Sequence, residues 1–241
     1  MLPKNLITIY GRNPVLEALT DSRLKIYALH LSKSNKSSSK LDKIISLARE
    51  QKIPIKYHTK EQLSFISKNK KQDQGVALDI ILDNLYSIDY LFDLKEFRVL
   101  ALDKITNPQN LGMIIRSATA GNIDAIILQK KGNAPLISPL TIKASSGTLF
   151  KLPIIQVDSL YKSLKELKLK DASIVTLSLD TNESFFEFKV PAKSIFILGN
   201  ESEGVSKEIE ALSNSKVKIP MNRGVESLNV AVTAALLAFC R

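Results

Sequence analysis

Three polar loops hold the residues of this chain best suited to chemistry. Residues 107–116 read Asn-Pro-Gln-Asn-Leu-Gly-Met-Ile-Ile-Arg, residues 199–204 read Gly-Asn-Glu-Ser-Glu-Gly, and residues 219–230 read Ile-Pro-Met-Asn-Arg-Gly-Val-Glu-Ser-Leu-Asn-Val. Each loop adjoins the end of an expected strand or helix, where α/β proteins build their binding and catalytic sites. The sequence therefore predicts that these loops form the site.

The first loop opens a helix that carries an arginine. Asn107 is a natural helix cap and Pro108 suits the first helical position. Arg116 lies four residues from both Gly112 and Ala120, so one helix face presents a cation between two small residues. This arrangement leaves room for a ligand or a partner backbone. A structural salt bridge of Arg116 explains the pattern equally well.

The second loop favours a cationic ligand over a phosphate. It holds Glu201 and Glu203 and no lysine, and it lacks the Gly-x-Gly-x-x-Gly spacing of a dinucleotide site. Gly199 directly follows an apolar strand, which lets a ligand approach the backbone closely. The alternative is an acidic turn that caps a helix at Ser206.

The third loop leads into an apolar helix over residues 227–239. Ser227 is a natural N-cap for this helix, and that role alone explains its presence. The helix is apolar on nearly every side, which is typical of a segment that serves both the core and a subunit interface.

Composition excludes several classes of protein. The 241 residues are 44% hydrophobic and 24% charged, as in ordinary soluble domains, and no apolar run reaches the ~18 residues of a membrane span. The first residues lack the apolar core of a signal peptide. One cysteine and two histidines, His30 and His58, cannot build a usual zinc site, and both histidines read as ordinary core or surface residues. We expect a cytoplasmic protein without a metal.

The positive charge is concentrated in the first third of the chain. Residues 1–77 hold 15 Lys/Arg and 6 Asp/Glu, a net charge of +9, whereas residues 78–241 hold 19 and 18, a net charge of +1. A general drift toward lysine would enrich both parts alike. The asymmetry therefore predicts a polyanion-binding module joined to a near-neutral one.

Apolar segments and turn signals alternate along the chain as in α/β proteins. We expect strands at 6–10, 26–31, 53–57, 75–82, 99–103, 125–129, 154–157, 174–179, 195–198 and 217–219. We expect helices at 13–19, 41–51, 60–66, 108–121, 138–145, 159–169, 206–212 and 227–239. Residues 83–96 read as a connecting helix or linker. The later strands are continuously apolar, which predicts a parallel sheet covered by helices on both faces.

Together the loops resemble the SpoU family of RNA ribose 2′-O-methyltransferases. The matching signatures are Asn107-Pro108-x-Asn110-x-Gly112-x-x-x-Arg116, Gly199-x-Glu201-x-Glu203-Gly204, and Ile219-Pro220-Met221 with Ser227-Leu228-Asn229-Val230. The resemblance covers residues 98–241 well and residues 1–77 more loosely, through Tyr10-Gly11-Arg12-Asn13-Pro14-Val15. It implies an RNA-binding domain over 1–77, a linker over 78–95, and a methyltransferase domain over 96–241 whose parallel sheet carries a deep trefoil knot.

The resemblance also implies a role for each site residue. Arg116 is the expected activating residue of catalysis, and Asn110, Glu201, Ser227 and Asn229 are expected to position the ribose, the phosphate and Arg116. S-adenosylmethionine is the implied cofactor, held near Leu177, Gly199, Ile219, Met221 and Leu228. A homodimer through the C-terminal domain is implied, because the family's active site forms where two knots meet.

A separate N-terminal domain resembles the members that modify a guanosine of 23S ribosomal RNA. Two alternatives stay open: a transfer-RNA ribose methyltransferase of the same family, and a non-catalytic RNA-binding factor of ribosome assembly. The last alternative predicts no use for Arg116 or the cofactor loops.

Overall fold

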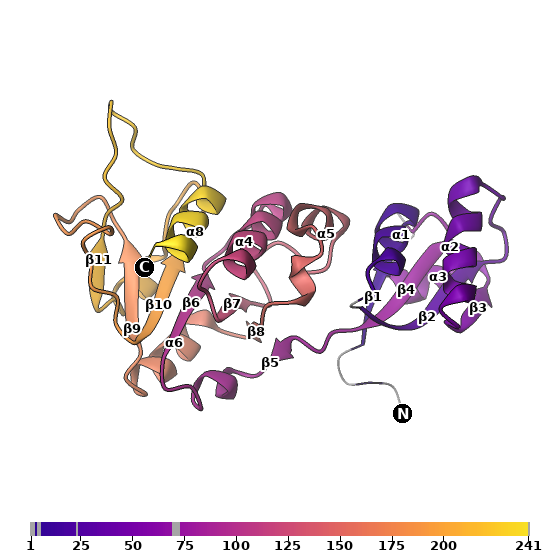
Figure 1. Ribbon diagram of the computed structural model, residues 1–241, viewed down its shortest axis with the longest axis horizontal. Helices are drawn as coiled ribbons and strands as arrows, with labels where there is room; N and C mark the ends of the chain where they lie inside the picture. The colour runs from indigo at the N-terminus through magenta and orange to yellow at the C-terminus, as the bar shows by residue number, and fades with distance from the viewer. Residues whose placement is uncertain (1–2, 4–5, 23, 69–72, 241) are drawn as a thin grey trace. The chain divides into compact units, whose positions relative to one another are not determined.

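The computed structural model describes residues 3, 6–22, 24–68 and 73–240. The chain divides into two compact units, Met1–Asp83 with Ile137–Lys143, and Asn84–Leu136 with Ala144–Arg241. Each unit is built around its own β-sheet (Figure 1). No helix in the described ranges is both long and apolar enough to cross a membrane.

The first unit contains a mixed four-stranded sheet. Its strands β1 (Leu6–Tyr10), β4 (Val76–Ile81), β2 (Lys25–Ser32) and β3 (Ile55–His58) lie in that order. Strand β4 is antiparallel to both β1 and β2, and β3 pairs parallel to β2. The four strands predicted in this region are thus present with small shifts at their ends.

Three helices accompany this sheet: α1 (Arg12–Thr20), α2 (Ser39–Glu50) and α3 (Lys60–Ser67). The hydroxyl of Ser38 accepts from the backbone N–H of Leu41 and so caps α2. At α3, Thr59 and Gln62 bond reciprocally in a capping box. The local sequence therefore defines where both helices begin.

The second unit contains a seven-stranded sheet in the order β11-β9-β10-β6-β7-β8-β5, and all its strand pairs are parallel. The strands are β5 (Leu85–Tyr86), β6 (Phe97–Leu102), β7 (Ala125–Gln129), β8 (Ile154–Val157), β9 (Ser173–Leu177), β10 (Lys193–Leu198) and β11 (Ser215–Val217). The predicted α/β fold with a parallel sheet is confirmed.

Helices cover both faces of this sheet. Helices α6 (Leu160–Lys168) and α7 (Lys207–Glu210) bury Leu164, Ile209 and their neighbours in the apolar cluster that holds Val99, Ile127 and Ile195 of the strands. Helices α4 (Pro108–Ala120) and α8 (Val230–Phe239) lie side by side (Figure 1) and contact the sheet at β7 and β10. The 3₁₀ turn η2 (Thr148–Phe150) also belongs to this unit, whereas most of α5 (Pro139–Ser145) belongs to the first unit.

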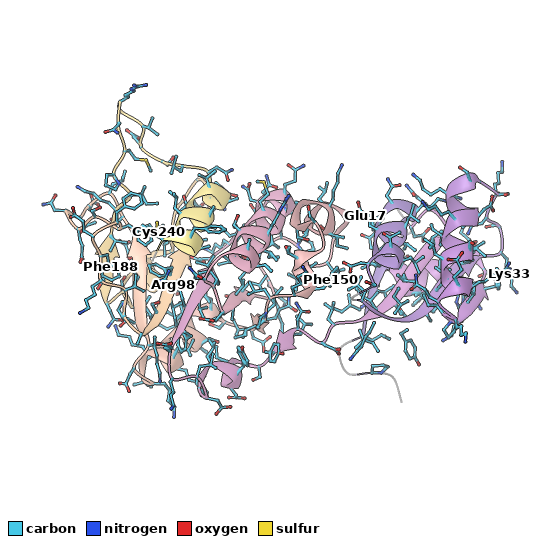
Figure 2. All side chains as sticks on the ribbon, viewed as in Figure 1. Glu17, Lys33, Arg98, Phe150, Phe188 and Cys240 are labelled. Atoms are coloured by element: carbon cyan, nitrogen blue, oxygen red, sulfur yellow. The ribbon has the colours of Figure 1, made fainter. Side chains whose placement is uncertain are left out.

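The packing of α4 against α8 depends on a glycine. A Cβ on Gly121 would lie 2.5 Å from the carbonyl oxygen of Ala238, and that oxygen accepts a hydrogen bond from the backbone N–H of Asn122 at 2.7 Å. Arg98 of β6 lies beside Cys240 (Figure 2) and donates from Nη1 to its carbonyl oxygen at 2.5 Å. The end of α8 is thereby tied to the sheet.

Residues 83–96 differ from the helix or linker that we predicted. They contain β5, which pairs with β8, and the 3₁₀ turn η1 (Ile88–Leu91). The side chain of Asn84 donates to the carbonyl oxygens of Leu149 and Leu152 at 2.7 and 2.8 Å. A two-residue strand is too short to show a periodic pattern, so this addition to the sheet has no sequence signal.

Candidate active site

The start of α4 places Asn110 inside the protein. The side-chain oxygen of Asn107 accepts from the backbone N–H groups of Gln109 and Asn110 at 2.8 and 3.4 Å, with Pro108 in the first turn. The predicted cap is confirmed. It fixes the first turn so that the side chain of Asn110, only 6% exposed, points away from solvent.

Asn110 joins the three loops through its side-chain amide. Its Nδ2 donates to Oε1 of Glu201 at 2.5 Å, and its Oδ1 accepts from Nδ2 of Asn229 at 3.2 Å. A carboxylate can only accept, so the contact with Glu201 fixes the orientation of the amide. Three residues predicted for the site, one from each loop, therefore form a single hydrogen-bonded chain.

Asn229, and not Ser227, caps α8. The side-chain oxygen of Asn229 accepts from the backbone N–H of Ala231 at 2.8 Å, and the helix begins at Val230. The predicted start of this helix at Ser227 is wrong because Asn229 occupies the cap position. Ser227 is exposed in the loop before the helix, where its hydroxyl is available to a ligand.

A residue that sequence reasoning missed, Asn200, holds the second loop in shape. Its Nδ2 donates to the carbonyl oxygen of Lys104 at 3.0 Å, and its Oδ1 accepts from the backbone N–H of Ser202 at 2.8 Å. Its backbone N–H and C=O both pair with Gly204. An asparagine whose side chain bonds the backbone N–H two residues later forms an Asx turn. An asparagine at the start of a polar loop was therefore the sequence signal for this role. Asn200 thereby fixes the position of Glu201.

Gly199 is required by the loop itself. A Cβ at this position would lie 2.2 Å from the carbonyl carbon of Gly204 and 2.3 Å from the nitrogen of Val205. Backbone atoms of the same loop therefore require a glycine here, and the close approach of a ligand to Gly199 stays a prediction. Gly199 still borders the cavity described next.

A cavity of about 420 Å³ lies where the second and third loops meet the end of β9. This volume falls within the range of roughly 300–1,000 Å³ that is usual for ligand pockets. Its lining includes all five residues predicted for cofactor binding and two of those predicted for catalysis: Leu177, Gly199, Ile219, Met221, Leu228, Glu201 and Ser227. Residues that sequence reasoning missed, among them Ser178, Lys218, Glu226 and Thr233, also line it.

Arg116 lies further along α4, outside the lining of this cavity. Its side chain is exposed, and its Nη1 donates to the hydroxyl of Ser146 at 3.2 Å. Within the described ranges no carboxylate forms an ion pair with it, so the salt-bridge interpretation finds no partner there. Every predicted site residue except Arg116 therefore either lines this cavity or belongs to the hydrogen-bonded chain that includes Glu201.

Comparisons with known proteins identify the family of this chain. The model of the SpoU rRNA Methylase family matches residues 98–239, and the model described as RNA 2′-O ribose methyltransferase substrate binding matches residues 8–84. The chain belongs to the SpoU rRNA methylase family. The assignment predicted from the three loops is confirmed, and with it the class of enzyme, an RNA methyltransferase.

Relatives in this family align with nearly the whole length of the chain. It is 30% identical to the 23S rRNA (guanosine-2′-O-)-methyltransferase RlmB of Xylella fastidiosa, over 96% of the chain and 94% of the relative. It is 28% identical to the putative TrmH family tRNA/rRNA methyltransferase YacO of Bacillus subtilis, over 96% and 93%. The structure of the SpoU methyltransferase AviRb from Streptomyces viridochromogenes, solved with AdoMet, has a TM-score of 0.70 at 21% identity and covers 97% of this chain and 88% of that one.

Proposed function

We propose that this protein transfers a methyl group from S-adenosylmethionine to the ribose 2′-hydroxyl of a guanosine in 23S ribosomal RNA, in the cytoplasm. The observation that carries the proposal is the hydrogen-bonded chain Glu201–Asn110–Asn229 at the edge of the cavity. It places polar groups from three loops beside one ligand-sized space. RlmB, the relative at 30% identity, is named for this reaction.

The cavity has the chemistry that the cofactor needs. Leu177, Ile219, Met221 and Leu228 give it apolar walls that suit an adenine ring, and the carboxylates of Glu201 and Glu226 suit a cationic sulfonium. Lys218 and the hydroxyl of Ser227 can hold a carboxylate group. When bound, S-adenosylmethionine supplies an electrophilic methyl group on its sulfonium. The described residues contain no cluster of His, Cys, Asp and Glu that could hold a metal ion.

Arg116 activates the ribose without giving up its proton. An arginine side chain stays protonated in proteins, so it cannot be a general base. Its guanidinium instead holds the neighbouring phosphate and stabilises negative charge that develops on the 2′-oxygen. The hydroxyl proton leaves to that phosphate or to water. Asn110, Ser227 and Asn229 position the ribose, and the 2′-hydroxyl restricts the reaction to RNA.

The active protein is a homodimer through the second unit. Arg116 lies outside the cavity of its own chain, so a second copy is the natural source of the arginine for each cavity. Apolar side chains on the two adjacent helices are exposed for such a contact: Met113 on α4 is 41% exposed, and Val232 and Phe239 on α8 are 49% and 57% exposed. The deep trefoil knot is part of the same proposal, with β10 lying between β6 and β9.

Ribosomal RNA is favoured over transfer RNA as the substrate. The first unit matches a substrate-binding model of RNA ribose methyltransferases, and it holds nearly all the excess positive charge of the chain. The alignment with RlmB includes this unit. YacO is named for either RNA, and this name supports a transfer-RNA methyltransferase as the second candidate.

Mapping ribose methylation in total RNA from a deletion strain tests the proposal. We expect one guanosine of 23S rRNA to lose its 2′-O-methyl group and to regain it on complementation. Loss of a transfer-RNA modification instead would establish the second candidate. Unchanged RNA, together with no S-adenosylmethionine binding by calorimetry, would identify a non-catalytic RNA-binding factor.

A further inference from the structure

A row of hydrogen-bonded polar side chains crosses the sheet of the first unit. Thr8 of β1 donates from its hydroxyl to Oδ1 of Asp79 on β4 at 2.6 Å. Oδ2 of Asp79 lies 2.9 Å from Nε2 of His30 on β2, and Nδ1 of His30 lies 2.9 Å from Nε2 of His58 on β3. The row therefore follows the order of the strands, β1-β4-β2-β3.

The inner members of this row are buried, and the outer end reaches solvent. His30 and Asp79 are 5% and 7% exposed. The side chain of His58 is half-buried. Its Nδ1 has no hydrogen-bond partner among the described residues, and this nitrogen is accessible to solvent. We predicted both histidines to be ordinary core or surface residues. Instead they belong to one hydrogen-bonded row that begins at a buried carboxylate and ends at an imidazole nitrogen that solvent can reach.

The hydrogen-bond roles along the row follow from the carboxylate. Asp79 can only accept, so Nε2 of His30 carries a proton. In the neutral row Nδ1 of His30 accepts from Nε2–H of His58, and the outward Nδ1 of His58 is then an acceptor. When the row takes up one proton, Nδ1 of His58 carries it and becomes a donor, whichever ring holds the charge. The buried carboxylate of Asp79 balances that charge.

Positive groups surround the outward end of the row. Lys33 follows β2 (Figure 2), and its backbone N–H donates to the carbonyl oxygen of His58 at 2.8 Å. Burial lowers the pKa of His58 below its ordinary value, and positive charges on His30, Lys56 and Lys33 lower it further. An anion placed among these groups would oppose both effects, because it attracts the proton that burial repels.

We propose that His58 binds a backbone phosphate of the RNA substrate through Nδ1–H, and that Asp79 and His30 orient the ring and balance the proton taken up on binding. Lys33, directly after β2, and Lys56 of β3 complete the anion site. This inference rests on the proposed function, since it assigns one phosphate contact within the RNA-binding unit. It also makes RNA affinity depend on pH, because the donor form of His58 is the binding form.

The test measures affinity of the full chain for a 23S rRNA transcript at pH 8 and pH 6, at constant salt. We expect the wild type to bind about three- to sixfold more tightly at pH 6, which corresponds to a pKa that rises by about one unit on binding. His58→Gln should bind equally weakly at both values. Asp79→Asn should lose most of the gain at pH 6. Lys43→Gln, which removes an exposed charge on α2, should lose RNA affinity by the same factor at both pH values and keep the pH dependence.

Two further measurements separate the explanations. The ring ¹⁵N shifts of His58 in the full chain should change to the protonated type when the rRNA transcript is added. A change with inorganic phosphate but not with RNA would overturn the proposal by assigning the site to the free anion. Equal affinity and pH dependence of folded His58→Gln and wild type would overturn it too. If the wild type binds no RNA while S-adenosylmethionine binding persists, the RNA-binding role of the first unit fails as well.

Discussion

The side chain of Asn229 donates to that of Asn110 at 3.2 Å, so the first turn of α8 is held against the first turn of α4. Each asparagine stands within or next to the beginning of its helix, and each belongs to a different loop of the site. Glu201 of the second loop accepts a hydrogen bond from the same side-chain amide of Asn110. The shape of the site therefore depends on one buried side chain.

Replacing Asn110 with Ala should loosen all three loops together. The variant leaves Glu201 and Asn229 without their shared partner, and a lost buried hydrogen bond of this kind costs about 1–3 kcal/mol. We expect a lower melting temperature and weaker S-adenosylmethionine binding by calorimetry. Asn222→Ala, which changes an exposed asparagine of the third loop, is the matched control and should leave both unchanged. Full cofactor affinity in Asn110→Ala would show that the chain of bonds does not shape the site.

Arg116→Ala should remove methyl transfer and leave cofactor affinity nearly unchanged. Its side chain lies outside the cavity but on the helix that carries Asn110. Loss of one charge-stabilising donor lowers kcat by about 10²–10³-fold. Single-turnover methylation of rRNA and cofactor calorimetry check the two parts. Arg116→Lys, which keeps the charge without the planar fork, should fall between the wild type and the alanine variant. Loss of cofactor binding together with the fold would instead indicate a structural role.

Acid should destabilise the first unit in two steps. The pKa of His58 is lowered by burial and then by neighbouring positive charge, so the folded state loses stability as the pH falls from about 6.5 toward that lowered pKa. Burial alone would raise the pKa of Asp79, but the hydrogen bonds from His30 and Thr8 outweigh it and lower the pKa below its ordinary value. The stability that Asp79 contributes is present above pH 4 or so and is lost as the pH falls through its folded pKa.

Urea unfolding without RNA at pH 7.5 and pH 5.5 checks the first of these steps. The wild type should be less stable at pH 5.5, and His58→Gln should lose less stability between the two values, because it lacks the titrating ring. Identical losses in both proteins would show that another group controls this range.

RNA affinity should fall steeply with salt, and the lysines after β2 should set part of the slope. We expect each lost phosphate contact to reduce the slope of log K against log salt by about 0.7–0.9. The triple variant Lys33→Gln, Lys36→Gln and Lys40→Gln removes three charges from the polar segment 32–40. The sequence holds a second basic, polar segment, Lys68–Lys71, of which residues 69–71 lie outside the described residues.

A control with the same change in net charge replaces Lys162, Lys165 and Lys189 with Gln in the second unit. Filter binding over a range of salt concentrations should show a reduced slope for the first triple variant only. Equal slopes for both would mean that the positive excess serves solubility and that the second unit recognises the RNA.

Much of the fold was predictable because its signals are local. Runs such as Ile195–Leu198 are continuously apolar, and Asn107-Pro108 defines a helix start, so neither depends on distant contacts. The strand order, and the addition of Leu85–Tyr86 to the sheet, depend on pairings between remote segments that no local pattern encodes. For the same reason the family resemblance, and not periodicity, supplied the site residues.

The errors at the site have a similar cause. Ser227 and Asn229 are both good caps, and the choice between them depends on the bond from Asn229 to Asn110, which is far away in sequence. The backbone of Gly204 requires a glycine at position 199, and this contact becomes visible only when the loop is folded. The row from Thr8 to His58 joins four strands, so it becomes visible only when the sheet is assembled.

The position of β10 constrains how the second unit folds during synthesis. This strand, Lys193–Leu198, lies between β6 at Phe97–Leu102 and β9 at Ser173–Leu177. Its two neighbours must leave a gap, or separate again, until the ribosome has released it. Contacts between such distant segments are formed slowly, because the intervening chain must first be closed into a loop. The sheet of the second unit therefore cannot be completed before Leu198 has left the ribosome.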